Sequence, residues 1–183
     1  YSSVLISALR FPKKVLSGSI WIDGLDLSEV DENDLRARVG IISNDSYIPF
    51  LSVRENLDPN SAYDDSQIWD VLNIVGLSAQ VAALKDGLLT NFNAIDPELF
   101  WTGEIVLFSF ARVLLNKNKI ICLDHVRLQE DIEQKVIELL NVEFFDKLLL
   151  VASNNRTFLD ECCQSVFQLQ ITAREIGRAS CRE

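Results

Sequence analysis

The strongest constraint on the fold is an alternation of short apolar runs with helical patterns in the second half of the chain. The runs at 119–124 and 147–152 are apolar except at their ends, as in strands buried on both faces. Helical patterns at 131–142 and 157–163 follow them, and 165–170 has the pattern of another strand. This order predicts an α/β fold, with a parallel sheet flanked by helices on both faces.

The first half of the chain predicts shorter elements around a helical insertion. A helix begins at the polar residues Ser2 and Ser3, and Asp23-Gly24 marks a turn after a strand. The insertion is a helical subdomain at about 64–115, which ends in an apolar helix capped by Thr102. The remaining predictions are a strand at 19–23, a helix at 31–38, a strand at 39–42, a helical turn at 53–57, helices at 64–75 and 78–84, and a loop at 86–99.

Charge and composition exclude several functions. The chain has 17 basic and 27 acidic residues, and a formal net charge of −10 disfavours binding to nucleic acid or to anionic membranes through the overall field. No stretch reaches the roughly 20 apolar residues of a membrane-spanning helix. The adjacent Cys162 and Cys163 match neither a metal knuckle nor a secreted disulfide framework, so we expect reduced thiols.

The two ends of the chain look unlike the ends of a natural domain. The first residue is Tyr1, and the chain contains no Met. Residues 174–183 resemble the translation of a sequencing-adapter oligonucleotide, although a natural basic tail is the alternative. We therefore expect one domain at 1–173, which is part of a longer protein, and a non-native tail at 174–183.

A carboxylate follows one of the buried strands. Ile120 to Leu123 is apolar, and Asp124 ends the run. Ligands of parallel α/β sheets bind outside the carboxyl ends of the strands. A carboxylate at such a position often holds Mg²⁺ beside a nucleotide phosphate.

Several motifs in a fixed order place the chain beside a known family. They are the start of a helix at Ser2, the stretch Ile22-Asp-Gly-Leu-Asp26, the stretch Arg54-Glu-Asn-Leu-Asp-Pro59, Gly103 at the start of the apolar helix, and Leu123-Asp124. This series resembles the nucleotide-binding domain of an ABC transporter, most closely the second such domain of the multidrug-resistance-associated (C) subfamily. The resemblance covers residues 1 to about 170.

The resemblance implies a P-loop NTPase-like sheet, with ATP and Mg²⁺ as cofactors. It also implies that the Gly-rich loop and the strands before it lie outside this chain. The expected partners are a second nucleotide-binding domain and the transmembrane domains of the same transporter, at the cytoplasmic face of a membrane. No nucleic acid is expected as a partner, and this segment itself does not insert into the membrane.

The family's phosphate and metal positions can be carried over one at a time. Tyr1 falls where the family has a Lys that contacts phosphates. Ser2 matches the Mg²⁺-ligating Ser, and Ser3 follows it in the same cofactor-binding segment. Asn44 takes the place of a Gln that senses the metal, and Asp124 matches the Walker B aspartate. The expected metal ligands are therefore Ser2, Asn44 and Asp124.

The family's signature and catalytic positions are mostly altered. The signature motif reads Phe100-Trp-Thr-Gly-Glu104, so Trp101, Thr102, Gly103 and Glu104 would face ATP on a partner domain. Asp131 matches the D-loop aspartate. His125 stands where the family has its general-base Glu, and Ser153 stands where it has its switch His.

These substitutions predict weak or lost hydrolysis in this copy. A degenerate cassette that docks on a partner cassette is the first interpretation. An active ATPase domain that couples ATP hydrolysis to transport, with His125 as a substitute base, is the alternative. A chain without function, from a decaying gene copy or a chimeric transcript, is the third interpretation.

Two tryptophans and two charged residues can be explained by packing or solvation as well as by a functional role. We expect Trp21 and Trp69 to be packing residues. Arg54 and Glu55 lie in the segment that faces the transmembrane domains in the family, or else they are solvated loop charges.

Overall fold

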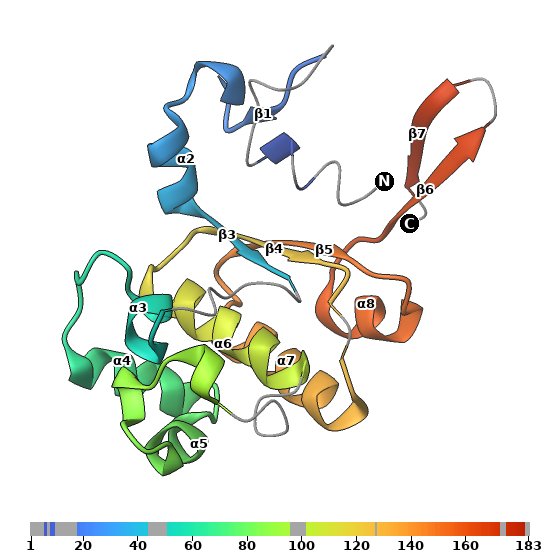
Figure 1. Cartoon of the computed structure of the whole chain (residues 1–183). Helices are drawn as coiled ribbons and strands as arrows, with labels where there is room; N and C mark the ends of the chain where they lie inside the picture. The colour runs from blue at the N-terminus through green and yellow to red at the C-terminus, as the bar shows by residue number, and fades with distance from the viewer. Residues whose placement is uncertain are drawn as a thin grey trace.

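The centre of the fold is a parallel three-stranded sheet. The computed structural model describes residues 6, 8, 9, 18–43, 51–95, 102–126, 128–172 and 175–181. Strands β3 (Val39–Ile42), β4 (Ile120–Asp124) and β5 (Leu148–Ala152) lie in the order β3-β4-β5 and pair in parallel (Figure 1). The predicted α/β class and the strands at these positions are confirmed. The helix predicted to begin at Ser2 starts outside the described residues.

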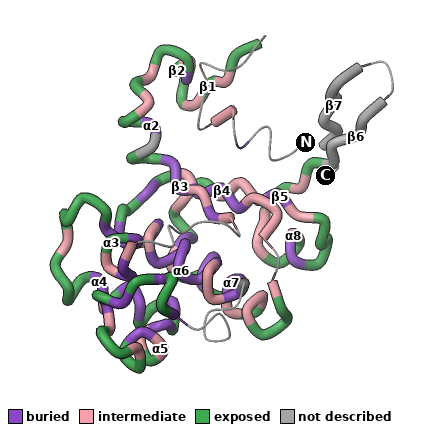
Figure 2. Tube along the Cα trace, in the orientation of Figure 1, coloured by how far each residue is buried: buried purple, intermediate pink, exposed green. Residues whose placement is uncertain are grey.

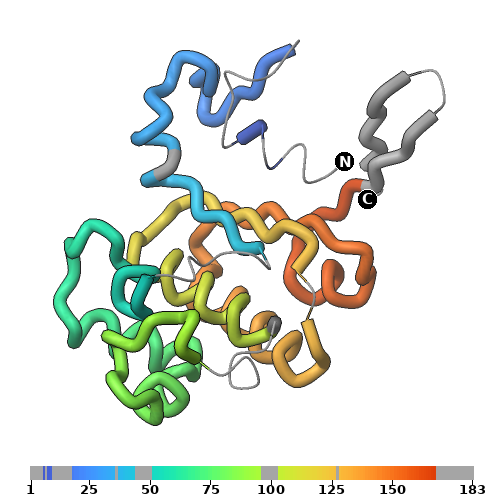
Figure 3. The backbone as a smooth tube through the Cα atoms, viewed as in Figure 1, coloured from blue at the N-terminus to red at the C-terminus, as the bar shows by residue number. Residues whose placement is uncertain are grey.

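Alternate residues of the strands face two different layers. On one face, Ile121 and Leu123 belong to the core formed with α6 (Thr102–Leu115), α7 (Glu130–Val142) and α8 (Arg156–Cys162). On the other face, Val39 and Cys122 cluster with Leu35 of α2 (Glu32–Arg38). This is the period-two alternation of strand side chains. The sheet therefore packs on helices α6, α7 and α8 on one face and contacts α2 on the other, in line with the predicted two-sided sheet, and Figure 3 shows the chain passing on both sides of it.

Two small elements lie in the chain before the sheet. Strands β1 (Trp21–Ile22) and β2 (Leu25–Asp26) form an antiparallel hairpin around the turn at Asp23-Gly24. The 3-10 helix η2 (Leu27–Glu29) follows, and its Leu27 is buried with the second layer. Trp69 packs against the main core as predicted, but the prediction for Trp21 is wrong. Trp21 is 61% exposed because it faces outward on this two-stranded hairpin, and its indole N–H donates to Ser19 Oγ at 2.8 Å.

A helical subdomain lies between β3 and β4 in the sequence, as predicted. Its helices are α3 (Val53–Leu57), α4 (Asp65–Ile74) and α5 (Ser78–Ala83), and in Figure 1 α3 lies to the left of α6, whereas α4 and α5 lie lower in the view. The part of the predicted loop at 86–99 that the structure describes contains the 3-10 helices η3 (Gly87–Leu89) and η4 (Phe92–Ala94). Single turns of this kind have no long apolar period, yet they bury Leu88 and Phe92 in the core.

Helix α6 approaches the sheet very closely at Gly40. A Cβ atom at this position would lie 2.8 Å and 2.9 Å from the two methyl carbons of Val113 on α6. It would also lie 3.1 Å from Asn118 Oδ1, and Asn118 Nδ2 donates to Ala37 O at 2.9 Å. Figure 2 shows that α6 is buried along much of its length. The absence of a side chain at Gly40 therefore sets the distance between α6 and β3.

The chain continues from α8 into a hairpin. Strands β6 (Phe167–Thr172) and β7 (Glu175–Cys181) pair antiparallel. The strand at 175–181 lies in the segment that the sequence analysis excluded from the fold, and the interpretation of 174–183 as a non-native tail stays a prediction. Within the described residues, no helix combines the length and apolar character needed to span a bilayer.

Candidate nucleotide site

The carboxyl ends of the three parallel strands meet at one edge of the sheet. The register pairs Ile42 with Leu123, and Asp124 with Ala152. The residues that follow these pairs therefore leave the sheet at the same edge, and His125 and Ser153 are among them. Parallel α/β proteins bind their ligands at this edge. The tertiary structure thus brings together Asp124, His125 and Ser153, three of the predicted site residues.

The backbone at His125 is held in an uncommon conformation. Its φ is +46°, in the left-handed region that few residues other than glycine adopt. Its N–H donates to Ala152 O at 2.9 Å, which fixes the turn out of β4 against the end of β5. The residue is half-buried. Strained residues of this kind gather at ligand sites and turns that the surrounding structure over-determines.

The hydroxyl of Ser153 is used inside its own loop. Ser153 Oγ accepts the N–H of Asn155 at 3.0 Å. Asn155 in turn caps α8, because its Oδ1 accepts the N–H of Phe158 at 3.3 Å. Its Nδ2 donates to both carboxylate oxygens of Glu133 on α7, each at 3.2 Å. The loop after β5 is therefore tied to α7.

Sequence reasoning missed the pair of Asn155 and Glu133. An Asn before an apolar helix is a recognisable N-cap signal, so the cap itself could have been predicted. The contact with Glu133 could not, because it joins residues on two elements.

A second group of predicted residues lies where α6 and α7 begin. Gly103 is buried, and a Cβ atom there would lie 2.7 Å from Ile132 Cγ1 on α7. Glu104 is half-buried in the first turn of α6, whereas Asp131 is exposed in the first turn of α7. The absence of a side chain at Gly103 is therefore explained by packing against Ile132, and its role in the signature motif stays a prediction. Helix α6 begins at Thr102, one residue before the predicted start at Gly103.

The other predicted positions lie outside the described residues. They are Tyr1, Ser2, Ser3, Asn44 and Trp101. Their roles stay predictions, as does that of the Thr102 side chain.

The described donors fit a phosphate-bound magnesium ion better than a metal centre made only of protein ligands. Among these residues there is no group of three or more His, Cys, Asp or Glu side chains that could hold a metal. Asp124 is a half-buried carboxylate at a strand end, and Mg²⁺ is often held by one or two carboxylates together with substrate phosphates. The imidazole of His125 is a poorer donor for Mg²⁺ than an oxygen ligand.

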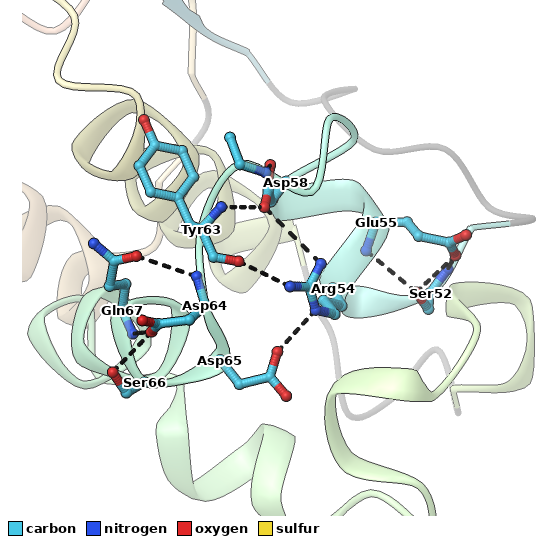
Figure 4. Close-up of polar contacts among 10 residues, drawn as sticks. Ser52, Arg54, Glu55, Asp58, Tyr63, Asp64, Asp65, Ser66 and Gln67 are labelled. Atoms are coloured by element: carbon cyan, nitrogen blue, oxygen red, sulfur yellow. Dashed lines mark hydrogen bonds and ion pairs between the residues drawn. The ribbon is translucent and has the colours of Figure 1, made fainter.

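An ion-pair network joins α3 to the start of α4 (Figure 4). Arg54 Nε donates to Asp65 Oδ1 at 2.8 Å, and Arg54 Nη2 donates to Tyr63 O at 2.9 Å. Asp58 is only 3% exposed, and its carboxylate accepts the N–H groups of Ala62 and Tyr63. Arg54 Nη1 lies 3.9 Å from Asp58 Oδ2. The interpretation of Arg54 as a solvated loop charge is therefore wrong, since the guanidinium links three segments of the subdomain.

Capping boxes begin α3 and α4. Ser52 Oγ accepts the N–H of Glu55, and the Glu55 carboxylate accepts from the N–H and hydroxyl of Ser52 at 2.9 Å and 2.7 Å. These two bonds lower the pKa of Glu55, with the hydroxyl as the larger cause. Asp64 and Gln67 form the same arrangement at α4, and bonds from Gln67 and Ser66 lower the pKa of Asp64.

A long-range bond fixes α3 against α6. Arg112 Nε on α6 donates to Asn56 O on α3 at 2.8 Å. Its guanidinium lies 5.9 Å from the ring centroid of Phe108, and burial lowers the pKa of Arg112. Helix α3 is thus held by both the start of α4 and α6.

Comparison with known proteins identifies the family of this chain. The family model for "ABC transporter" matches residues 2–126. The ABC transporter gloK of Glarea lozoyensis is 32% identical over 162 residues, which cover 87% of this chain and 12% of that protein. The vacuolar heme ABC transmembrane exporter abc3 of Schizosaccharomyces pombe is 36% identical over 161 residues, which cover 86% of this chain and 11% of that protein. ATP-binding cassette sub-family C member 2 of Mus musculus is 36% identical over 116 residues, which cover 63% of this chain and 8% of that protein.

This chain belongs to the ABC transporter family. It is an ATP-binding cassette domain of the kind found in membrane transporters, and its relatives include members of the C subfamily, as the motifs predicted. Domains of this family bind ATP and Mg²⁺ in general. The chain spans about a tenth of the length of these relatives, as the shares of 12%, 11% and 8% show.

Proposed function

We propose that this chain is the cassette of a membrane exporter in which ATP hydrolysis is weak or lost. Its role is then to dock on a partner cassette, at the cytoplasmic face of the membrane and beneath the transmembrane domains of the same transporter. The observation that carries the proposal is the composition of the sheet edge. Asp124 is followed there by an imidazole instead of a second carboxylate, and the hydroxyl of Ser153 accepts a backbone N–H of its own loop.

The loss of one catalytic group explains why the other catalytic positions of this cassette could also be substituted. A family member needs a base at the position of His125 and an imidazole at the position of Ser153. Groups that act together are strongly non-additive, so once one is lost the others contribute little to the rate. The scaffold is meanwhile kept, because each face of the sheet still contributes residues to a buried hydrophobic cluster.

Nucleotide binding would rest on a reduced set of residues. Asp124 would hold Mg²⁺ together with Ser2 and Asn44, and bound Mg²⁺ would neutralise phosphate charge. Tyr1 supplies no cation for the phosphates, unlike the Lys that the family has there. Glu104 places a negative charge in the first turn of α6. This charge would repel a phosphate of ATP bound to a partner cassette, which a helix N-terminus otherwise attracts. Binding at both sites should therefore be weaker than in an intact cassette.

The second candidate is an active ATPase domain in which His125 is a substitute base. The half-buried position of His125 beside Asp124 favours it, since an imidazole can accept a proton near neutral pH. The two candidates differ in how strongly removal of the His125 side chain lowers the rate of ATP hydrolysis.

The test is ATP turnover by the purified full-length transporter that contains this cassette, with His125→Ala as the variant. We expect turnover to change less than about twofold, because a general base contributes roughly 10²- to 10⁴-fold and this site supplies none. Ser153→Ala is the matched control, because it changes a neighbouring polar side chain at the same edge. A loss of about 100-fold in His125→Ala alone would overturn the proposal and establish the active alternative.

A further inference from the structure

Two adjacent thiols lie close together at the end of α8. Cys162 Sγ and Cys163 Sγ are 3.7 Å apart, and both residues are half-buried. Cys162 is the last residue of the helix, and Cys163 is its C-cap in an extended conformation, with φ −123° and ψ 135°. This change of backbone direction brings the two side chains to the same side.

The distance favours a bridge through one atom over a direct S–S bond. Adjacent Cα atoms across a trans peptide are about 3.8 Å apart, shorter than the roughly 4.4 to 6.8 Å usual in disulfides. An S–S bond would also require the 3.7 Å separation to shrink to about 2.05 Å. By contrast, a soft centre with bonds of about 2.3 Å to each sulfur, at an angle of about 95° to 109°, holds two sulfurs about 3.4 to 3.8 Å apart.

The number of donors decides which soft centre fits. Structural zinc needs four ligands, and within the described residues no third His, Cys, Asp or Glu joins this pair to make a metal site. The ligand must therefore complete its own valences with groups that it already carries. A trivalent arsenic atom bearing one organic substituent has two valences left for thiols.

We propose that Cys162 and Cys163 form a dithiol site that binds trivalent organoarsenic compounds. This site is separate from the nucleotide edge and does not depend on the proposed function. In the reaction with a hydrated arsine oxide, R–As(OH)₂, two As–S bonds replace two As–O bonds. The two thiol protons leave with the two hydroxyl groups as two water molecules. Arsenic stays trivalent, so no oxidant or reductant takes part.

The two sulfurs would react in a fixed order. The Cys162 thiol donates to Phe158 O at 2.9 Å, and its sulfur lies 3.7 Å from Cys163 Sγ, a contact in which either thiol can donate. The contact between the two sulfurs lowers the pKa of Cys163 and raises that of Cys162. The Cys163 thiolate forms first and attacks arsenic, since the thiolate is the nucleophile. Cys162 then displaces the second hydroxyl group from the same atom.

The chain also contains an internal control. Cys122 is buried in β4, and burial raises the pKa of Cys122 to about 12, with the nearby charge of Asp124 as a smaller cause. It should stay unmodified in the folded protein.

The test is intact-protein mass spectrometry with phenylarsine oxide as the probe. We expect one phenylarsenic group per folded chain, which survives about a 100-fold excess of a monothiol and is removed by a small dithiol, as expected of two linked thiols. Cys162→Ser and Cys163→Ser should each lose the adduct at a monothiol concentration about 100-fold lower than the parent chain does. Cys122→Ser and Cys181→Ser should behave as the parent chain.

A comparison in urea separates a folded site from mere adjacency in the sequence. We expect the adduct to withstand at least about tenfold more monothiol in the native chain than in the unfolded chain, because the fold holds the sulfurs at bridging distance. Equal resistance in the two states would overturn the proposal. So would an adduct that either single variant at Cys162 or Cys163 retains, or one that Cys181→Ser removes.

Discussion

Replacement of Gly40 by Ala should destabilise the domain by about 2 to 3 kcal/mol, in the range expected for overpacking plus a weakened hydrogen bond. The new Cβ would lie 2.8 Å and 2.9 Å from the methyl carbons of Val113, both closer than a van der Waals contact allows. Val113 is only 4% exposed, and a β-branched side chain has few other rotamers. Asn118 cannot yield freely either, because it is buried and donates to Ala37 O.

The assay is urea unfolding of the chain, followed by far-UV circular dichroism, with a double-mutant cycle. Val113→Ala alone should cost about 1 to 3 kcal/mol through the cavity that it leaves. In the double variant the new methyl group fills part of that cavity, so the loss should be at least about 1 kcal/mol smaller than the sum of the two single losses. An unchanged free energy of unfolding in Gly40→Ala would refute the close approach of α6 to β3. So would losses of free energy in the two single variants that add up exactly to the loss in the double variant.

Two further predictions concern the segment around α3. Arg54→Ala should reduce the free energy of unfolding by about 2 kcal/mol, because it removes charge-assisted bonds to Asp65 and Tyr63 O and leaves the buried Asp58 with backbone donors only. Arg54→Lys should recover less than half of this loss, since Lys lacks the fork of donors, and a loss below about 0.5 kcal/mol in urea unfolding would contradict the network. The pKa of Glu55 is lower in the folded state than its usual value, so its stabilisation is complete above the usual value and is lost as the pH falls through the folded value. Urea unfolding at several pH values should therefore show that the parent chain is more stable than Glu55→Gln near neutral pH, and that this difference shrinks in acid; a difference independent of pH would contradict the role of the Ser52 bonds.

Elements with a clear local signal could be predicted from the sequence. Strand β3 at 39–42 and helix α3 at 53–57 have the predicted bounds, and helix α6 begins one residue before the predicted 103–115, because each carries its own apolar pattern or cap. The turns at 87–94 could not be predicted as helical, since a single 3-10 turn has no period to detect. The exposure of Trp21 was also missed, because a strand pattern does not tell which face will be covered.

Some features of the candidate site could likewise be predicted from the sequence, and others could not. The order of short motifs in the sequence was enough to predict the family and the position of Asp124 at the end of a buried strand. The sequence could not predict that Ser153 is tied to Asn155 and Glu133, or that Gly103 is packed against Ile132. Each of these contacts depends on how two elements dock, and docking depends on all the side chains between them.

The sequence by itself determined the α/β class, the bounds of the main strands and helices, and the family, because periodicity and motif order are local properties. Only the tertiary structure decided that Arg112 holds α3 through Asn56 O, and that Gly40 sets the distance from β3 to α6. It likewise placed the two sulfurs of Cys162 and Cys163 at bridging distance. The physical reason is that distances between side chains, even adjacent ones, follow from backbone turns and close packing, which no single segment specifies.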